Sequence, residues 1–238
     1  MRLDKYISSQ RTDLSRADVK KLIRQGRVSA AGKTASDPGM QVGEDCEVTL
    51  DGERIHYKEH IYIMLNKPAG YVCSAREGNS PTVYDLIPPE LNRRGLFPAG
   101  RLDKDTEGFV LMTDDGQLAH DMLSPGRHVP KRYHVRLAEP YRPEYAERFA
   151  AGITIDGGEV CLPAEAYPDP GDPFAFTLIL HEGKFHQVKR MAEAVGNRVV
   201  YLRREAIGNL DIAPGLGLGE CLELMHKDVE KLLAAQSG

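Results

Sequence analysis

The stretch GRLDKDTEGFVLMTDDGQLAH, residues 100–120, joins a charged turn to an apolar segment that is rich in strand-forming residues. The turn places Asp103 and Asp105 among basic residues and glycines. The segment LFPA before the turn is apolar too. A loop between two buried segments is held rigidly, which suits a catalytic carboxylate but also an ordinary polar turn. From the residue types alone, both interpretations stay open.

Paired acids of this spacing also occur in metal-dependent phosphatases. In that pattern the first Asp directly follows an apolar strand, and a Thr stands two residues past the second Asp. Here the residues GRL precede Asp103, and Thr106 follows Asp105 at once. A basic residue beside the acid also opposes Mg²⁺ binding. A metal-dependent hydrolase is therefore a poor fit to this turn.

Motifs that bind phosphates or metals are missing from the sequence. It contains no GxxxxGK(S/T) loop, no GxGxxG after a strand, no GxSxG elbow and no HExxH. His181 and His186 are five residues apart, a poor spacing for metal ligands on a helix, and we interpret both as structural or RNA-facing. We therefore expect no metal and no cofactor.

The cysteines and the N-terminus indicate a cytoplasmic protein. Four scattered cysteines show no metal-ligand spacing and are too few for a disulfide framework: Cys46, Cys73, Cys161 and Cys221. Reduced thiols are the expected state. The N-terminus lacks the apolar core of a signal peptide, and no apolar run is long enough to span a membrane.

Charge is distributed unequally along the 238 residues. The formal net charge is −4, but residues 1–33 hold nine Lys and Arg against three Asp, a net charge of +6 that leaves −10 for the remainder. A basic end on an acidic body indicates a polyanion-binding module joined to a second domain.

The segment SRADVKKLIRQG, residues 15–26, predicts an amphipathic helix in this basic end. Ser15 is a typical N-cap with Asp18 three residues later, and Gly26 is a typical stop. Basic residues share one face, within about 80° of one another on a helix of 100° per residue: Arg16, Lys20, Arg24 and Arg27. A face of one sign suits phosphate binding, although a merely solvated face stays the alternative.

Residues 1–58 resemble the small RNA-binding domain first named after ribosomal protein S4. The matching blocks occur in the family's order: RLDKYIS, SRADVKKLIRQGRVSAAGK and the GEDCEV strand. The resemblance implies that five basic residues contact RNA phosphates without reading the base sequence: Arg16, Lys20, Lys21, Arg24 and Arg27.

Strand signals dominate from residue 59 onward. Strands are predicted at IYIMLN, at YVCS after the turn KPAG, and at FVLMT, YHVRLAE and FAFTLIL. The predicted helices are FHQVKRMAEAVG, which stops at Gly196, and the terminal HKDVEKLLAAQ. TDDG at 113–116 favours a turn that leaves a strand, with Asp115-Gly116 supplying a positive φ. We expect an α+β protein, in which a small α/β domain (1–58) precedes a mixed, mostly antiparallel sheet with flanking helices (59–238).

The blocks of the second domain resemble the pseudouridine synthases of the RsuA type. GRLDKDTEG is similar to the family's catalytic segment, and four further blocks keep the family's order: MLNKPAGYVCS at 64–74, PKRYHVRL at 130–137, EGKFHQVKRMAEAVGN at 182–197 and VVYLRREAIGNL at 199–210. The resemblance implies the pseudouridine synthase fold. It also implies a reaction that breaks the N1–C1′ bond of a uridine, rotates the uracil and rejoins it through C5, without metal or redox partner.

The resemblance also implies the roles of individual residues. Asp103 is the catalytic carboxylate, Asp105 supports it, and Lys189 is its basic partner, with the adjacent Arg190 as the alternative. Many relatives have Arg at position 189, and Lys weakens bidentate pairing while keeping the charge. Tyr133 stacks on the target base.

Two further residues are assigned to the extruded nucleotide. Arg101 fills the gap that the flipped nucleotide leaves in the RNA, and Leu202 lines the apolar pocket. Taking a base out of its stack costs a few kcal/mol, which contacts in the pocket recover.

The chain length, without an extended basic tail, resembles the small-subunit enzymes of the family. This implies a monomer that modifies 16S ribosomal RNA at uridine 516, in a small-subunit precursor or assembly intermediate. The alternatives are a synthase for large-subunit (23S) RNA, a non-catalytic RNA-binding assembly factor, and a metal-dependent hydrolase. The presence of Asp103, Tyr133 and Lys189 together weighs against a vestigial pocket.

Overall fold

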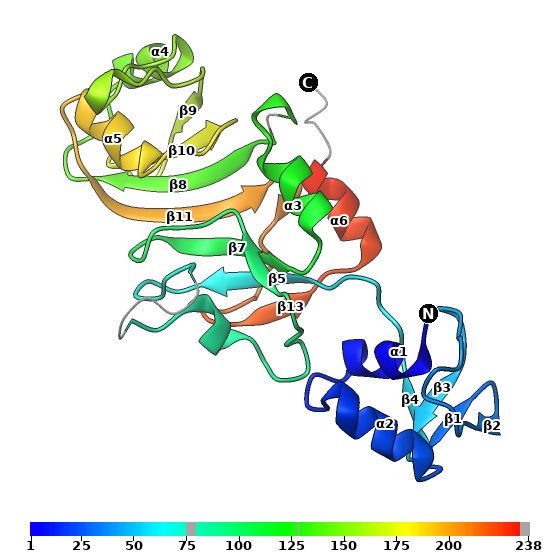
Figure 1. Ribbon diagram of the computed structural model, residues 1–238. Helices are drawn as coiled ribbons and strands as arrows, with labels where there is room; N and C mark the ends of the chain where they lie inside the picture. Colours follow the sequence, from blue (N-terminus) through cyan, green and yellow to red (C-terminus); the bar gives the residue numbers. More distant parts are fainter. Residues whose placement is uncertain (75–79, 128, 234–238) are drawn as a thin grey trace. The chain divides into compact units, whose positions relative to one another are not determined.

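The computed structural model describes residues 1–74, 80–127 and 129–233 (Figure 1). The chain divides into two compact units, one made of Met1–Ile61 and Pro89–Leu96, the other of Tyr62–Pro88 and Phe97–Gly238. Hydrogen bonds within the first unit hold the inserted segment: Thr12 Oγ1 donates to the Asn92 carbonyl over 3.1 Å, and Arg93 Nη1 donates to the Lys58 carbonyl over 3.0 Å. The domain boundary predicted at residue 58 leaves Pro89–Leu96 out of the first domain, whereas the structure groups this segment with it.

The first unit packs two helices against a four-stranded sheet. The helices are α1 (Leu3–Gln10) and α2 (Arg16–Arg24), and the sheet has the order β2-β1-β3-β4, from β1 (Val28–Ala30), β2 (Lys33–Thr34), β3 (Val48–Leu50) and β4 (Glu53–Ile55). Ser15 and Asp18 form a capping box at the start of α2, and Gly26 follows the helix with a φ of 74°. The cap and the stop predicted from the sequence are confirmed.

A buried carboxylate, Asp4, joins the two helices of this unit. Its oxygens lie 3.1 Å from Arg2 Nε, 3.0 Å from Arg16 Nη2 and 3.9 Å from Lys20 Nζ. The hydrogen bond from Arg2 outweighs the effect of burial, and with Arg16 it lowers the pKa of Asp4 to about 2. Arg16 and Lys20, both predicted to bind phosphate, therefore also hold α2 to α1.

The second unit is built on a sheet that has nine strands in the described residues. Its order is β13-β5-β7-β11-β8-β10-β9, with β6 on β7 and β12 on β11. The strands are β5 (Tyr62–Lys67), β6 (Phe97–Ala99), β7 (Glu107–Thr113), β8 (Lys131–Leu137), β9 (Glu165–Pro168), β10 (Ala175–Leu180), β11 (Val199–Ile207), β12 (Leu210–Asp211) and β13 (Cys221–Glu223). Only the β7–β11 pair among these is parallel, so the predicted α+β class with a mixed, mostly antiparallel sheet is confirmed.

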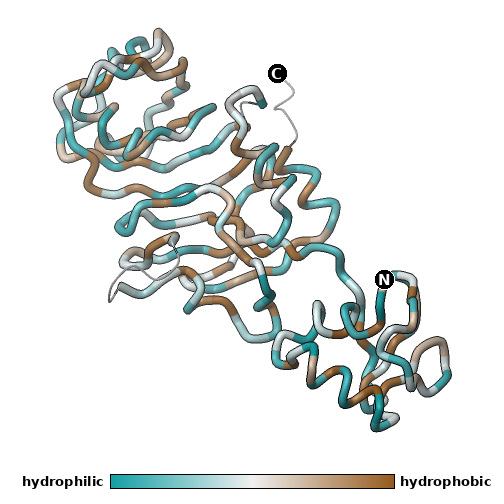
Figure 2. The backbone as a smooth tube through the Cα atoms, in the orientation of Figure 1, coloured by the Kyte–Doolittle hydropathy of each residue, from teal (hydrophilic) through white to brown (hydrophobic). Residues whose placement is uncertain are grey.

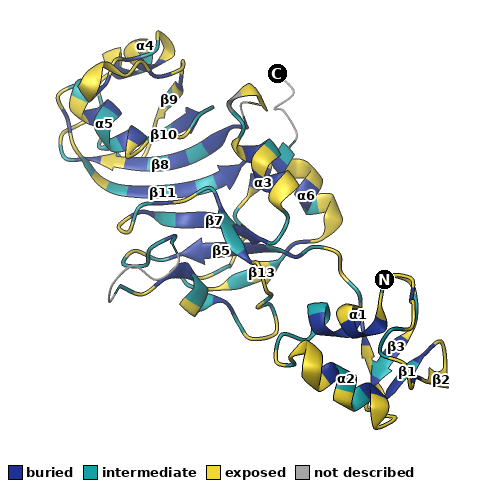
Figure 3. Ribbon diagram, in the orientation of Figure 1, coloured by how far each residue is buried: buried dark blue, intermediate teal, exposed yellow. Residues whose placement is uncertain are grey.

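The helices of this unit pack at two places on the sheet (Figure 1). Helices α3 (Gly116–Leu123) and α6 (His226–Leu233) share a hydrophobic core with the central strands. The buried residues of this core include Met64, Phe109 and Leu111 from the strands, Met122 from α3 and Leu232 from α6. Helices α4 (Glu144–Ala150) and α5 (Gln187–Ala194) lie toward the β8–β10 end. The described part of this unit also contains short 3-10 turns at Val83–Leu86, Pro125–Arg127 and Asp156–Gly158. Apolar and buried residues concentrate along the central strands (Figures 2 and 3).

Both helices predicted for the second domain are found, and two other local predictions are wrong. Gly116 opens α3 without a positive φ, because Asp115 accepts hydrogen bonds from Gln117 N and Leu118 N and so caps a helix. The YVCS segment forms no strand in its described residues beyond a bridge from Val72 to Thr82. Residues 234–236 of the predicted terminal helix lie outside the described part of the chain.

A close backbone approach at Gly108 fixes the parallel pair of strands. Gly108 lies opposite Arg204 in the β7–β11 register and has a φ of 104°. A Cβ at this position would lie 2.2 Å from the Arg204 carbonyl oxygen. Only glycine fits there, and the approach brings the start of β7 against the middle of β11. None of the described helices has the length and apolar character needed to cross a lipid bilayer.

We expect Asp4→Asn to destabilise the first unit at neutral pH. Because the folded-state pKa of about 2 lies below the ordinary 3.8, the stabilising charge is fully present above pH 3.8 and is lost as the pH falls through 2. Hydrogen exchange of amides 3–10 should therefore be faster in the variant at pH 7, and the difference should shrink in acid. Asp13→Asn, which removes an exposed partner of Arg11, should have a small effect. Equal effects of the two substitutions would contradict the role of Asp4.

Candidate active site

The acidic turn of residues 100–106 links β6 to β7 and presents two carboxylates of unequal exposure. The Asp103 side chain is 26% exposed, whereas that of Asp105 is 73% exposed. The Thr106 amide donates to the Asp103 carbonyl over 3.2 Å, which closes the turn. Asp103 is therefore the more shielded acid, and Asp105 lies at the surface.

A lysine from α5 bridges the two acids. Lys189 Nζ lies 3.0 Å from Asp103 Oδ2 and 2.6 Å from Asp105 Oδ1, although the residues are far apart in sequence. Burial lowers the pKa of Lys189, but hydrogen bonds to Asp105 and Asp103 outweigh it, so that this pKa is raised. Burial raises the pKa of Asp105, but Lys189 outweighs it, so that this pKa is lowered. Lys189 and Asp105 therefore keep opposite charges throughout the neutral range.

His186 also faces the proposed catalytic carboxylate. It stands at the N-cap of α5 with a left-handed φ of 49°, and its Nε2 lies 3.4 Å from Asp103 Oδ1. The sequence predicts a structural or RNA-facing role for His186 and does not connect it with Asp103. Its position one helical turn before Lys189 is the signal that could have indicated it, since residues three apart share a helix face. His181 instead lies 3.7 Å from Glu165.

A buried lysine on β5 holds the acidic turn through hydrogen bonds to its backbone carbonyls. Lys67 is completely buried, and its Nζ donates to the carbonyls of Thr106 at 2.7 Å, Lys104 at 3.2 Å and Pro68 at 3.1 Å. The Gly70 amide donates to the same Lys104 carbonyl over 2.7 Å. Burial lowers the pKa of Lys67. The NKPAG segment thus supports the turn, a role that no motif in the sequence indicates.

A buried arginine on β11 holds the start of the same turn and the strand β7 that follows it. Arg204 is 2% exposed, and it donates from Nη2 to the Gly100 carbonyl at 3.0 Å and from Nε to the Phe109 carbonyl at 2.8 Å. Arg204 therefore fixes the start of the turn and the strand beyond it, and Lys67 fixes the turn at Lys104 and Thr106. Charge-assisted hydrogen bonds of this kind are stronger than neutral ones, so the turn is well ordered.

Tyr133 and Leu202 lie on the paired strands β8 and β11. Tyr133 is opposite Arg204 and Leu202 is opposite Val135, and both side chains are buried. Residues two apart on a strand share a face, so Tyr133, Leu202 and Arg204 lie on one side of the sheet. No hydrogen bond or ion pair in the described residues joins Tyr133 or Leu202 to the acids.

The two remaining arginines assigned to the substrate differ in their surroundings. Arg101 is exposed and forms no hydrogen bond or ion pair within residues 1–74, 80–127 and 129–233. Arg190 binds the Asp156 side chain, donates to the Asp156 carbonyl over 2.8 Å and lies 2.6 Å from Glu159 Oε2. Lys189 rather than Arg190 thus contacts Asp103.

The basic residues of the first unit also divide into two groups. Arg16 and Lys20 face Asp4, and Arg27 lies 2.5 Å from Asp51. Lys21 and Arg24 are exposed, and neither has an ion pair or hydrogen bond through its side chain in the described residues. These two are the most available cations on α2.

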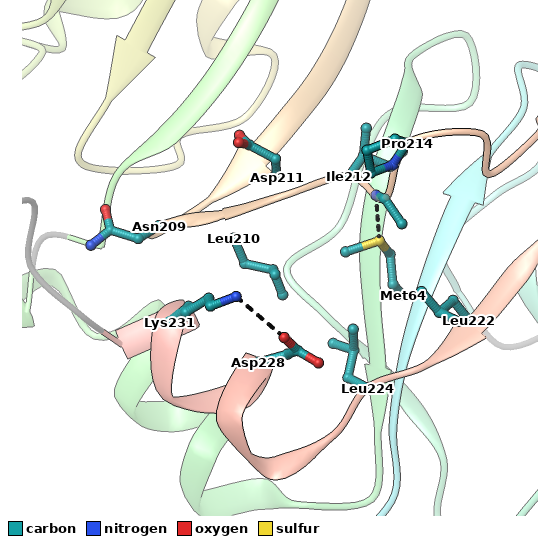
Figure 4. Close-up of a pocket in the computed structure, with 11 residues that line it drawn as sticks. Met64, Asn209, Leu210, Asp211, Ile212, Pro214, Leu222, Leu224, Asp228 and Lys231 are labelled. Atoms are coloured by element: carbon teal, nitrogen blue, oxygen red, sulfur yellow. Dashed lines mark hydrogen bonds and ion pairs between the residues drawn. The ribbon is translucent and has the colours of Figure 1, made fainter.

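A hollow at α6 is separate from the acidic turn. Figure 4 shows it between α6, β12 and the central strands, with Met64, Leu210 and Leu224 among its lining residues, and Asp228 3.4 Å from Lys231. It contains none of the residues predicted for the site. Within the described ranges, no group of three or more His, Cys, Asp or Glu is arranged to hold a metal ion.

Comparison with known proteins decides the family. A profile of the RNA pseudouridylate synthases matches residues 61–194, and a profile of the S4 domain matches residues 1–48. The chain is 44% identical over 241 residues to the uncharacterized RNA pseudouridine synthase YtzG of Bacillus subtilis (strain 168), covering 100% of both proteins. The chain belongs to the RNA pseudouridine synthases.

Other relatives of the synthase support this assignment over its full length. It is 40% identical to the ribosomal small subunit pseudouridine synthase A of Haemophilus influenzae, covering 98% of this chain and 100% of the relative. The protein of that name from Escherichia coli (strain K12) is 39% identical, with the same coverage. A crystal structure of a pseudouridylate synthase matches with a TM-score of 0.68 and 39% identity, covering 98% of this chain and 99% of the other. The pseudouridine synthase fold predicted from the sequence is confirmed.

We expect Lys67→Met to slow the chemical step of the synthase by at least tenfold, about 1.4 kcal/mol. Without the ammonium, the Lys104 and Thr106 carbonyls lose a donor, and the turn that presents Asp103 loosens. The measurements are the single-turnover rate at saturating RNA and hydrogen exchange of residues 100–108. Lys104→Met serves as the control because its exposed ammonium contacts only the Ser80 hydroxyl in the described residues. An unchanged rate with an equally protected turn would show that Lys67 does not position Asp103.

Proposed function

We propose that the synthase converts a uridine of small-subunit ribosomal RNA to pseudouridine, at the position equivalent to uridine 516 of 16S RNA, with Asp103 as its catalytic carboxylate. The observation that most supports this role is the contact of Asp103 with Lys189 and His186 on a turn fixed by buried cations. Relatives named for the ribosomal small subunit support the target. A precursor or assembly intermediate of the subunit is the proposed substrate.

The proposed chemistry uses Asp103 rather than Asp105 because the two carboxylates differ in exposure. Electrostatic interactions are stronger where water is excluded, and Asp103 is the more shielded of the pair. Its carboxylate attacks the base or the sugar as a nucleophile, or removes a proton from the ribose, while the N1–C1′ bond breaks. The uracil then turns and C5 bonds to C1′, as the carboxylate leaves the carbon that it attacked or as the ribose regains its proton. The C5 proton is released, and N1 takes up a proton. Lys189, whose Nζ lies 3.0 Å from Asp103 Oδ2, orients the carboxylate.

The other site residues act on the extruded nucleotide in this proposal. Tyr133 stacks on the target uracil, and Leu202 lines the same side of the pocket. The exposed Arg101 enters the gap that the nucleotide leaves in the RNA. Extrusion costs a few kcal/mol, and the stacking and edge contacts in the pocket recover it.

Carbodiimide mapping of small-subunit RNA treated with the protein tests the proposed function directly. It reports whether pseudouridine forms and at which position. Modification at the equivalent of uridine 516 would support both activity and target. If only large-subunit RNA were modified, the proposed substrate would be wrong and the activity right. If neither RNA were modified, the proposed activity would be contradicted.

We expect Asp103→Asn to abolish turnover while folding and RNA affinity are retained, because the charge acts in bond breaking. Tritium release from 5-tritiated uridine RNA measures the rate. Asp105→Asn is a matched control, since it removes the same charge from the same lysine at an exposed position, and its effect should be milder. If Asp103→Asn kept more than about a tenth of the wild-type rate, the loss of transition-state stabilisation would be under ~1.4 kcal/mol. The nucleophile would then be another residue.

We expect the double variant Lys21→Ala with Arg24→Ala to weaken RNA binding most at low salt. Each phosphate contact removed should lower the slope of log affinity against log salt by about one unit or less. Turnover at saturating RNA should be unchanged, because both residues lie in the S4 domain. Lys33→Ala, which removes an exposed charge from β2, is the control for net charge. Equal slopes for all three proteins would show that α2 is merely solvated.

A further inference from the structure

An exposed aromatic pair stands next to the proposed catalytic carboxylate. The Phe185 side chain is 75% exposed, and its ring lies on the His186 imidazole with centroids 3.8 Å apart and planes 19° apart. His186 Nε2 in turn lies 3.4 Å from Asp103 Oδ1. One side chain therefore separates the carboxylate from an aromatic face that is open to solvent.

The loop that presents this pair is held firmly. Arg190 Nη1 donates to the Phe185 carbonyl over 3.1 Å, and the Lys184 amide donates to Gln187 Oε1 over 2.9 Å. Gln187, which is buried, also donates to Glu182 Oε1 over 2.7 Å. Phe185 is thus held at the surface before any ligand arrives, which lowers the entropic cost of stacking on it.

The backbone at His186 is strained in a way that needs an explanation. A residue with a side chain rarely adopts a left-handed φ such as 49°, and it does so at a cost that the surroundings must offset. Strain of this kind concentrates at functional sites. Here it is found at the residue that joins the exposed ring to Asp103.

We infer that Phe185 and His186 form a stacking platform for the RNA base next to the target uridine. This inference rests on the proposed function, in which the target nucleotide lies at Asp103. Extruding one nucleotide removes a stacking partner from its neighbours, and an exposed aromatic face can replace that partner. Every base has a π-face, so the platform takes any base and contributes affinity rather than sequence selection.

The platform differs from the pocket proposed for the target base. Tyr133 is buried on β8 and is suited to an inserted uracil, whereas Phe185 faces solvent beside α5. Single exposed apolar side chains are common on protein surfaces and need no explanation by themselves. Phe185 is distinguished by its stacked partner, its fixed loop and its link to Asp103. Tyr167, also exposed, instead bonds Glu165 on β9 and makes no contact with the acids in the described residues.

The test combines three variants with three model RNAs that contain the mapped target uridine. The variants are Phe185→Ala, the conservative Phe185→Tyr, and Tyr167→Ala as a matched exposed aromatic. One RNA is intact, and the others have an abasic site immediately 5′ or 3′ of the target. Equilibrium affinity is measured by fluorescence anisotropy, and turnover at saturating RNA by tritium release.

We expect Phe185→Ala to weaken binding of intact RNA about 5- to 100-fold. Phe185→Tyr and Tyr167→Ala should stay near the wild-type affinity, and Tyr167→Ala should also keep the wild-type turnover at saturating RNA. On one of the two abasic RNAs, the wild-type protein should lose affinity by the same factor. Phe185→Ala should bind that abasic RNA no more weakly than it binds the intact RNA, because the substitution and the missing base remove the same contact.

Two results would overturn the platform: wild-type affinity in Phe185→Ala, and additive losses on both abasic RNAs. Wild-type affinity together with a fall in saturated turnover would mean that Phe185 only orients His186. Failure of the proposed function looks different, because the wild type would then release no tritium from the intact RNA. The affinity comparison is read independently of turnover, so the two failures are distinguishable.

Discussion

Hydrogen bonds from two buried cations to backbone carbonyls hold the turn on which the proposed site depends. Lys67 on β5 and Arg204 on β11 flank the central strand β7, and together they bind carbonyls at the start, middle and end of residues 100–109. Burying a charge is costly unless it is well hydrogen-bonded. The carbonyls meet that requirement only when the turn has this one conformation, so the cost of burial favours a single placement of Asp103.

The same turn presents its two acids to α5. Its backbone carbonyls bind the buried cations, whereas the side chains of Asp103 and Asp105 contact Lys189, and Asp103 also contacts His186. The charges of both acids also favour the protonated form of Lys67, against the burial that lowers its pKa. Support and site are thus electrostatically linked through the turn.

Local features were predictable from the sequence, and contacts between distant residues were not. The cap at Ser15 and the helix at 187–194 follow from nearby residues, because capping and periodicity are short-range effects. The pairing of Lys189 with Asp103 was expected only from the family resemblance. Lys67 at the end of β5 and Arg204 within β11 are charged residues, and no local pattern shows that they are buried. The prediction of a positive φ at Asp115-Gly116 was wrong, because an Asp-Gly pair suits the start of a helix as well as a turn.

A lysine at position 189 suits the geometry of this turn, because its ammonium can contact both acids. A guanidinium binds one carboxylate through two parallel hydrogen bonds, whereas an ammonium is a compact charge whose donors can point to different acceptors. Lys189 uses this freedom to bridge two carboxylates. Because Asp105 is exposed, water screens its charge, and Lys189 is shared with an acid that solvent already stabilises. Asp103 therefore has an oriented carboxylate that shares its lysine with a second acid, which suits the role of nucleophile or base that we propose for it.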